Sequence, residues 1–142
     1  KLNVFQLKGL RKILKMDTTF VNRANTNREV FRRANAIKNP DQTDGKNIKT
    51  FQQYVETKQE SLLKHTIRAE DTDPLKQTTF EPNTVAPPIH AKRRVGRPRK
   101  QWVTETYKRI YINNGIGTLQ TWNLDPWAAI RNTITPIRNR TI

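Results

Sequence analysis

The chain has 142 residues, of which 27 are Lys or Arg and 12 are Asp or Glu, so its formal net charge is +15 at pH 7. Only 34% of the residues are hydrophobic and cysteine is absent, which excludes disulfides, thiol nucleophiles and zinc sites that use cysteine. A chain this basic and this poor in apolar residues can bury a small core but not a deep enzymatic cavity, and its default partner is a nucleic acid.

The first predicted element is an amphipathic helix within residues 4–15. Its apolar side chains recur every three or four residues: Val4, Leu7, Leu10, Ile13 and Leu14. Four cations occupy the remaining faces: Lys8, Arg11, Lys12 and Lys15. We expect these four cations to contact nucleic acid.

A second helix is predicted from Thr26 to about Lys38, ending before Pro40. Thr26 and Glu29 have the spacing of a capping box, in which each side chain binds the other residue's free amide. The apolar stripe of this helix has four members: Val30, Phe31, Ala34 and Ile37. Three arginines outside the stripe are expected to be exposed, and the last two are candidate nucleic-acid ligands: Arg28, Arg32 and Arg33.

The longest predicted helix spans Thr50 to Ala69 and is the expected centre of the core. Its apolar face combines six residues: Phe51, Tyr54, Val55, Leu62, Leu63 and Thr66. Pro74 breaks this helix, and residues 75–80 are predicted to form a short strand or an extended arm. Residues 81–101 contain four prolines and no helical period, which predicts an extended linker.

The C-terminal third predicts two more helices. One runs from Trp102 to Asn114 and is closed by Gly115. The other is opened by Asp125-Pro126, runs through Arg131, and is ended by Thr135-Pro136. The aromatic residues of this region are expected to form a local core, with stacking on unpaired bases as the alternative: Trp102, Tyr107, Tyr111, Trp122 and Trp127. A tail with two further candidate cations follows: Arg138 and Arg140.

These elements together predict a mainly α fold. We expect a small core of four to five helices and a long, extended, proline-rich basic arm. Three regions follow from the pattern: an N-terminal helical region in 1–70, the linker and arm in 71–101, and a C-terminal helical region with a basic tail in 102–142.

The arm carries the densest charge of the chain in residues 92–100, which we call the basic block and which contain no acid. Its six cations and the Trp102 that follows are candidate nucleic-acid ligands: Lys92, Arg93, Arg94, Arg97, Arg99, Lys100 and Trp102. Gly96 and Pro98 keep this backbone from being helical, so its guanidinium groups are presented on a slim strand that can follow phosphates. A Gly-Arg-Pro core is typical of an AT-hook, which binds the minor groove of A·T-rich DNA. The alternative is an arm laid along structured RNA, which also accounts for the proline linker and both basic ends. A third interpretation is that this stretch is a solvated basic loop that binds no ligand.

Residues able to support catalysis are few and scattered. Magnesium sites need two or three carboxylates that converge; Asp71 and Asp73 form a close acidic pair, but they directly follow a helix end, where solvated acids are common, and no nuclease motif follows them. His65 and His90 are far apart in sequence, and Ser61 lacks the glycine-flanked turn of a serine nucleophile. We therefore expect no catalytic residue, no metal site and no cofactor.

Several sequence segments occur here in an order and at a spacing that are also found in one known group of proteins. Four of them lie between the third helix and Trp102: Leu62 to Ala69, Asp73 to Phe80, Arg93 to Arg99, and Trp102 itself. They resemble the segment that follows the reverse transcriptase domain in non-LTR (LINE-like) retrotransposon polyproteins, where a Leu-Gly-His-x-x-Arg helix end precedes a basic Arg-x-Gly-Arg-Pro-Arg-x-x-Trp block. Phe5 to Leu14 and Asn25 to Asn27 extend the similarity over residues 5–110.

Two departures from that family limit what the resemblance implies. Lys64 stands where the family usually has glycine, and no Tyr-x-Asp-Asp metal-binding turn of a polymerase is present. The resemblance therefore implies a module that holds nucleic acid without the catalytic part. Such a module is either a fragment of an element or a piece reused by the host as a structural protein.

The expected function is a non-catalytic, RNA-binding subunit of a large ribonucleoprotein such as a ribosome, with protein neighbours and no small-molecule substrate. The alternatives are a DNA- or RNA-binding module of a LINE-type reverse transcriptase complex and an AT-hook protein. No apolar run approaches a membrane span and no secretory signal is present, so we expect an intracellular protein without a membrane partner. Because the sequence starts at Lys1 rather than Met, a cleaved presequence and the mitochondrial matrix or another organelle are expected, with the nucleus as the alternative.

Overall fold

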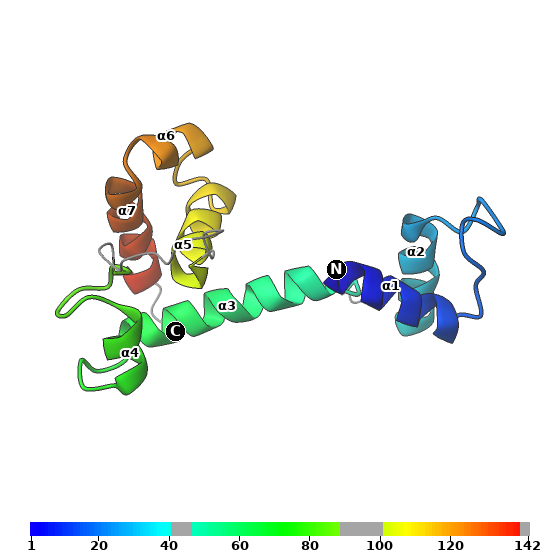
Figure 1. The fold of residues 1–142 in the computed structure, drawn as a ribbon, viewed down its shortest axis with the longest axis horizontal. Coiled ribbons are helices and arrows are strands. Elements are labelled where there is room, and N and C mark those ends of the chain that lie inside the picture. The colour runs from blue at the N-terminus through cyan, green and yellow to red at the C-terminus, as the bar shows by residue number, and fades with distance from the viewer. Residues whose placement is uncertain (41–46, 89–100, 140–142) are drawn as a thin grey trace, which may run out of the picture. The chain divides into compact units, whose positions relative to one another are not determined.

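The computed structural model describes residues 1–40, 47–88 and 101–139, and these residues contain seven helices and no strand (Figure 1). The prediction of a mainly α fold is confirmed. The chain forms two compact units, Lys1–Glu56 and Thr57–Ile142, and each is described by itself. The six cations of the basic block and Arg140 lie outside the described residues. The three regions predicted from composition stay a prediction.

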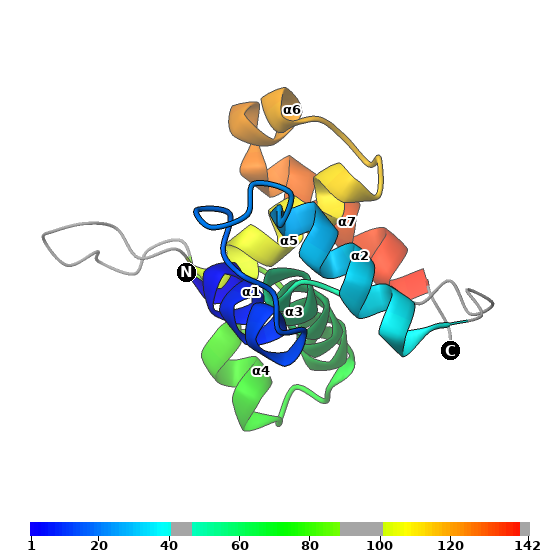
Figure 2. The same cartoon turned by 90° about the vertical axis from the view of Figure 1, so that its right-hand side faces the viewer.

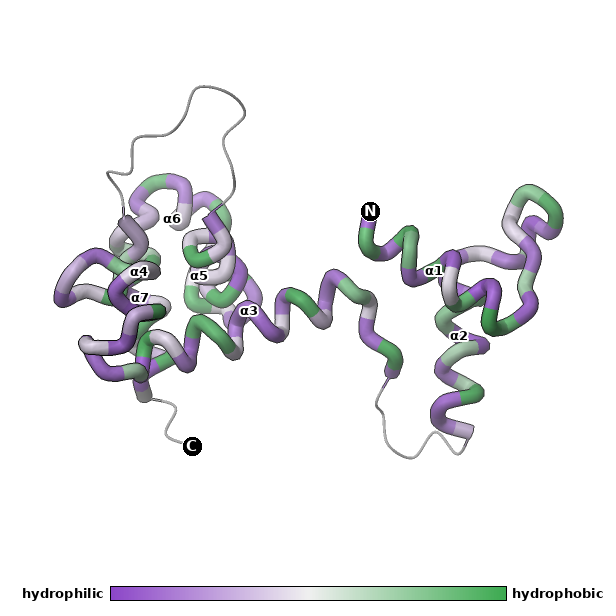
Figure 3. Tube along the Cα trace, turned by 60° about the horizontal axis from the view of Figure 1, so that its bottom comes forward, coloured by the Kyte–Doolittle hydropathy of each residue, from purple (hydrophilic) through white to green (hydrophobic). Residues whose placement is uncertain are grey.

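Unit 1 contains α1 (Leu2–Ile13), α2 (Asn27–Lys38) and the start of α3 (Phe51–Arg68). Apolar and polar residues alternate along α1 and α2, as the hydropathy colouring of Figure 3 shows. The two helices pack together through a small core made by three buried side chains and three partly buried ones: Leu7, Met16 and Val30, with Leu10, Leu14 and Phe31. The predicted amphipathic faces of both helices are thus correct in their central turns.

A buried amide holds the beginning of α3 to α1 within this unit. Gln6 donates from Nε2 to the carbonyl of Lys49 (2.9 Å) and accepts from the amide of Phe51 (2.8 Å) through Oε1. Gln6 is almost wholly buried, so these two bonds satisfy a polar group that water does not reach.

The ends of the predicted apolar stripes are exposed rather than buried. Val4 and Ile13 of α1, Ile37 of α2 and Tyr54 of α3 each expose more than half of their surface. The core of unit 1 is short, and the outer turns of each helix extend past the region that the partner helix covers. Helical periodicity predicts which face of a helix is apolar, but it does not predict how much of that face the neighbouring helix covers.

Unit 2 contains the rest of α3, α4 (Pro74–Thr79), α5 (Trp102–Asn113), α6 (Leu119–Leu124) and α7 (Pro126–Asn139). Figures 1 and 2 show α7 running alongside α5, with α6 at the end where they are joined. The core is larger than that of unit 1 and has twelve buried members: Leu63, Ile67, Phe80, Val85, Val103, Tyr107, Ile110, Tyr111, Trp122, Ala129, Ile130 and Ile137. Tyr107, Tyr111 and Trp122 are core residues, as predicted.

The prediction of a strand or extended arm in residues 75–80 is wrong, because α4 occupies this stretch. Asp73 caps the helix: its Oδ1 accepts hydrogen bonds from the amides of Leu75 (2.8 Å) and Lys76 (3.3 Å). Pro74 is the first helical residue, where its missing amide proton costs nothing. The Asp-Pro pattern that correctly predicts the start of α7 at Asp125 also occurs here.

The predicted end of the last helix is also wrong, since α7 continues through Pro136 to Asn139. A proline inside a helix removes one hydrogen bond and costs about 3 kcal/mol. Ile130 and Ile137 are buried in the core on either side of Pro136, and their packing holds the helix together. Arg138 therefore lies on the last turn of a helix and not in a tail.

Candidate nucleic-acid interface

Three exposed lysines lie on α1 and just after it. Lys8 and Lys12 are four residues apart, which places them on one face of α1, and Lys15 follows two residues after the helix ends. Leu7 lies on a different, buried face. The helix contains no acidic residue. We call these three residues the lysine stripe; its charge is not offset by any acid on α1.

Lys15 has an unusual backbone conformation for a residue other than glycine, with a φ of 53°. It follows α1 at the position where a left-handed residue lets the chain turn, and the amide of Met16 bonds to the carbonyl of Arg11 (2.9 Å). Glycine takes this conformation without steric cost, whereas lysine does not. A cation is thus held at the end of the stripe at a position that favours glycine.

Arg11 differs from the lysine stripe because its guanidinium group turns back onto the protein. Its Nη2 donates to the carbonyl of Asn25 (3.2 Å) and to Oδ1 of Asn27 (2.8 Å), and the residue is half-buried. These bonds fix residues 25–27, which lead into α2, against α1. Arg11 is predicted as a ligand of nucleic acid, but its contacts are those of a structural residue.

Arg32 and Arg33 share one carboxylate. Glu29 accepts from Nη2 of Arg32 (2.7 Å) and from Nε of Arg33 (2.8 Å). Hydrogen bonds from Arg32 and then Arg33 lower the pKa of Glu29 from its ordinary value of 4.5 to about 2. Guanidinium groups are stronger donors than a neutral amide, and the described contacts include only the Thr26 half of the predicted capping box, at 3.3 Å.

Among the described residues of unit 1, five further cations are exposed and are absent from the predicted set: Lys1, Arg23, Arg28, Lys38 and Lys49. For those in residues 1–40, the signal that could have indicated them is the scarcity of acids there, since this stretch has only Asp17 and Glu29. Sequence spacing groups cations on a helix, but Arg23 and Lys49 lie between helices. Their exposure could not be read from a helical period.

In unit 2, Trp102 lies at the start of α5, half-buried, where it packs against the edge of the core. It also lines a pocket of about 550 Å³ together with eight other residues from α3, α4, α5 and the chain before α5: Leu62, Leu75, Thr78, Thr79, Pro87, Pro88, Gln101 and Val103. We call this the Trp102 pocket. Pro88 and Gln101 both line it, so the two residues that flank segment 89–100, which carries the basic block, meet at this pocket.

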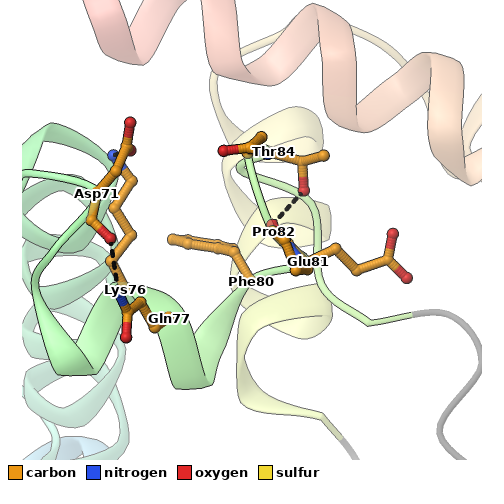
Figure 4. Close-up of a pocket in the computed structure, with 8 residues that line it drawn as sticks. Asp71, Lys76, Gln77, Phe80, Glu81, Pro82 and Thr84 are labelled. Atoms are coloured by element: carbon orange, nitrogen blue, oxygen red, sulfur yellow. Dashed lines mark hydrogen bonds and ion pairs between the residues drawn. The ribbon is translucent and has the colours of Figure 1, made fainter.

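A second pocket, of about 360 Å³, lies between α4 and residues 80–84 (Figure 4). Its polar groups are used internally: Lys76 Nζ binds Asp71 Oδ1 (2.9 Å) and the carbonyl of Ala69 (2.7 Å). Thr84 donates to the carbonyl of Glu81 (2.9 Å). The hydrogen bond and charge of Lys76 lower the pKa of Asp71, which keeps its negative charge. Two carboxylates on its wall, those of Asp71 and Glu81, make this pocket unfavourable for phosphate.

The two aspartates weighed for metal chemistry have other contacts: Asp73 caps α4 and Asp71 binds Lys76. His65 is exposed on α3, and His90 lies outside the described residues. Within the described ranges, no group of three or more His, Asp and Glu side chains lies close enough to hold a metal ion. No helix in the described part of the chain is long and apolar enough to cross a membrane.

Comparisons with protein-family models, with curated proteins and with solved structures find no match to this chain.

Proposed function

We propose that this protein is a non-catalytic structural protein that binds RNA within a large ribonucleoprotein, such as a ribosome, mitochondrial ribosomes included. The observation that carries the proposal is the lysine stripe: Lys8 and Lys12 share one face of α1, which contains no acid, and Lys15 is a third exposed lysine just after the helix. Ammonium groups in such a row can each neutralise one phosphate and release its counterion. The net charge of +15 supports the same partner.

The position of Lys15 adds an independent argument. A lysine in the left-handed region costs about 1 kcal/mol or more relative to glycine. A cation at a strained position indicates a use for its charge beyond folding. Lys15 thus adds a third exposed cation close to the C-terminal end of α1.

The resemblance to retrotransposon proteins supports an origin of this chain in such an element, and it also suggests a second candidate function. The Leu62 to Ala69 segment and the basic block favour a module derived from a LINE-type polyprotein, which the host has reused as a structural protein. The second candidate is the same module acting inside a reverse transcriptase complex. The parent reading frame separates the two: a polymerase domain encoded upstream of Lys1 supports the element, and a short frame with a presequence supports the host protein.

The test measures affinity of the full chain for three probes of equal length: a structured RNA hairpin, an A·T-rich DNA duplex and a G·C-rich DNA duplex. Fluorescence anisotropy at several salt concentrations gives both affinity and the number of phosphates contacted. We expect the hairpin to bind most tightly. A preference for the A·T-rich duplex would support an AT-hook instead, and no binding at low salt would reject both.

A triple variant then tests the stripe itself. Lys8→Gln, Lys12→Gln and Lys15→Gln together should lower the slope of log affinity against log salt by about 2 to 3 units if all three contact phosphates. The matched control replaces three exposed lysines elsewhere, Lys1, Lys49 and Lys58, and so removes the same charge. Equal slopes for the two triple variants would show that only net charge matters and that the stripe is no interface.

A further inference from the structure

We propose that the Trp102 pocket binds one unpaired nucleobase of the RNA, stacked on the Trp102 indole. This inference rests on the proposed function and names a binding site within it. The pocket, the aromatic side chain and the adjacent charge each contribute a separate argument.

The size and lining of the pocket suit a flat, partly apolar ligand. Its volume of about 550 Å³ lies within the range of small-ligand pockets. Leu62 and Leu75 both remain about 41% exposed at its walls, although each is a large aliphatic residue. Apolar surface of this kind on a very basic protein indicates a partner that covers it. Pro87 and Pro88 add a stiff wall without side-chain charge.

Trp102 and Gln101 supply the two types of contact that a base needs. The indole is half-buried, so its position is fixed by the core while part of it remains open to the pocket. Stacking on an aromatic ring is tolerant of base identity, because every base has a π face. Gln101 is exposed and its Oε1 accepts from Thr104 (3.2 Å), which orients the amide. Thr78 and Thr79 also line the pocket, and the Thr78 hydroxyl, which donates to the carbonyl of Pro74 (2.9 Å), can still accept a hydrogen bond.

The positive charge next to the pocket favours a nucleotide over an apolar peptide as its ligand. Both residues that flank segment 89–100 lie at the pocket, and that segment holds six cations and no acid. The pocket is therefore covalently joined, through Pro88 and through Gln101, to a strongly positive segment. This charge favours a polyanion as the ligand. The N-cap of α5, Gln101, makes no side-chain hydrogen bond to the first-turn amides, and these amides can donate to a phosphate oxygen as well. The carboxylate-lined pocket of Figure 4 has none of these features.

The experiment compares two single-stranded RNA probes of equal length, one with bases and one in which the central sugars are abasic. The full-length wild-type protein should bind the base-containing strand more tightly by about 5- to 150-fold, the range that one stacked base provides. Trp102→Ala should lose this difference and keep the affinity for the abasic strand. The matched control is Trp127→Ala, because Trp127 is also half-buried but lies outside the pocket; it should behave as wild type.

A second variant avoids any effect of Trp102 on folding. Leu75→Gln makes the pocket wall polar without changing charge, and its exposure means that the fold tolerates it; Leu124→Gln, on the exposed end of α6, is its control. Leu75→Gln should reduce the preference for bases and Leu124→Gln should not. If wild type binds both strands equally, or if Trp102→Ala and Leu75→Gln keep the preference, the pocket proposal is wrong while RNA binding stands. If wild type binds neither strand at low salt, the proposed function fails together with it.

Discussion

The hydroxyl group of Tyr107 donates a hydrogen bond of 2.7 Å to the backbone carbonyl of Val85, and both residues are buried. The bond links α5 to the chain that immediately precedes Pro87 and Pro88. Burial raises the pKa of Tyr107 above its ordinary value, so the phenol remains a proton donor under all ordinary conditions. One wall of the Trp102 pocket is thus held to the helix that carries Trp102.

Replacing Tyr107 with Phe should destabilise unit 2 by about 1 to 3 kcal/mol, since the carbonyl of Val85 would be left buried without a donor. Denaturant unfolding followed by circular dichroism measures the change. Tyr54→Phe is the control, because Tyr54 is a largely exposed tyrosine on α3, and its effect should stay within about 0.5 kcal/mol. A Tyr107→Phe protein as stable as wild type would mean that the carbonyl finds water and that the bond does not hold the wall.

Substitution by alanine should have opposite effects on protein stability at Gly117 and at Gly9. A Cβ at Gly117 would collide with the ring and hydroxyl of Tyr111, which is buried and bonds to Thr121 (2.9 Å). Gly117→Ala should therefore destabilise the protein by about 1 to 3 kcal/mol. Gly9 lies inside α1, where an added Cβ would have no neighbouring atom within 4 Å, and Gly9→Ala should stabilise the protein by about 0.5 to 1 kcal/mol. Thermal unfolding of the two variants gives both signs, and a shift in the same direction for both would contradict this expectation.

The predicted helices are correct where a local signal and a tertiary contact agree. Thr26 caps α2 and Asp125 caps α7 as their sequence patterns indicate, and α3 begins and ends within one residue of its predicted limits. The errors at α4 and at Pro136 have one cause. Proline predicts a break in both places, although the first is at a helix start and the second is held by packing that is not visible in local sequence.

The candidate site is less predictable than the fold. Arg11 and Lys12 are adjacent cations outside the apolar face of one helix, and spacing alone treats them alike. The structure separates them because the backbone of Asn25 and the side chain of Asn27 approach only Arg11. The convergence of Pro88 and Gln101 on one pocket also depends on long-range packing, so no local pattern could reveal that the residues flanking the basic segment meet.

The different roles of Arg11 and Lys12 lead to a pair of variants with opposite readouts. Arg11→Gln should lower the stability of unit 1 by about 1.5 to 3 kcal/mol, because it removes two hydrogen bonds from a charged group. Its effect on the salt dependence of RNA binding should be small. Lys12→Gln should leave stability unchanged within about 0.5 kcal/mol and lower the salt slope by about one unit. Denaturant unfolding and anisotropy titrations on the same samples test this; exchanged outcomes would reverse the two roles.

Lowering the pH should destabilise α2, because Glu29 becomes protonated. The folded-state pKa of this carboxyl is about 2, below its ordinary value of 4.5, so its ion pairs contribute stability above pH 4.5. That contribution is lost progressively as the pH falls from 4.5 towards 2, because the carboxyl becomes protonated. Amide hydrogen exchange in α2 should therefore accelerate over this window in wild type more than in Glu29→Gln, which has no charge to lose. Parallel pH profiles for the two proteins would show that the pairs with Arg32 and Arg33 contribute nothing to α2.

The basic block offers a test of charge that is independent of the lysine stripe. Replacing Arg94, Arg97 and Arg99 with Gln should weaken RNA binding and lower the salt slope by about one unit for each arginine that binds a phosphate. Base preference should remain, because the Trp102 pocket is intact in this variant, and the ratio of affinities for base-containing and abasic strands measures it directly. Arg32→Gln with Arg33→Gln should have a smaller effect per arginine, since Glu29 already neutralises part of their charge and accepts from Nε and Nη2 of Arg32 and from Nε of Arg33. An unchanged salt slope in the triple variant would remove the block from the phosphate interface and leave the lysine stripe as its main part.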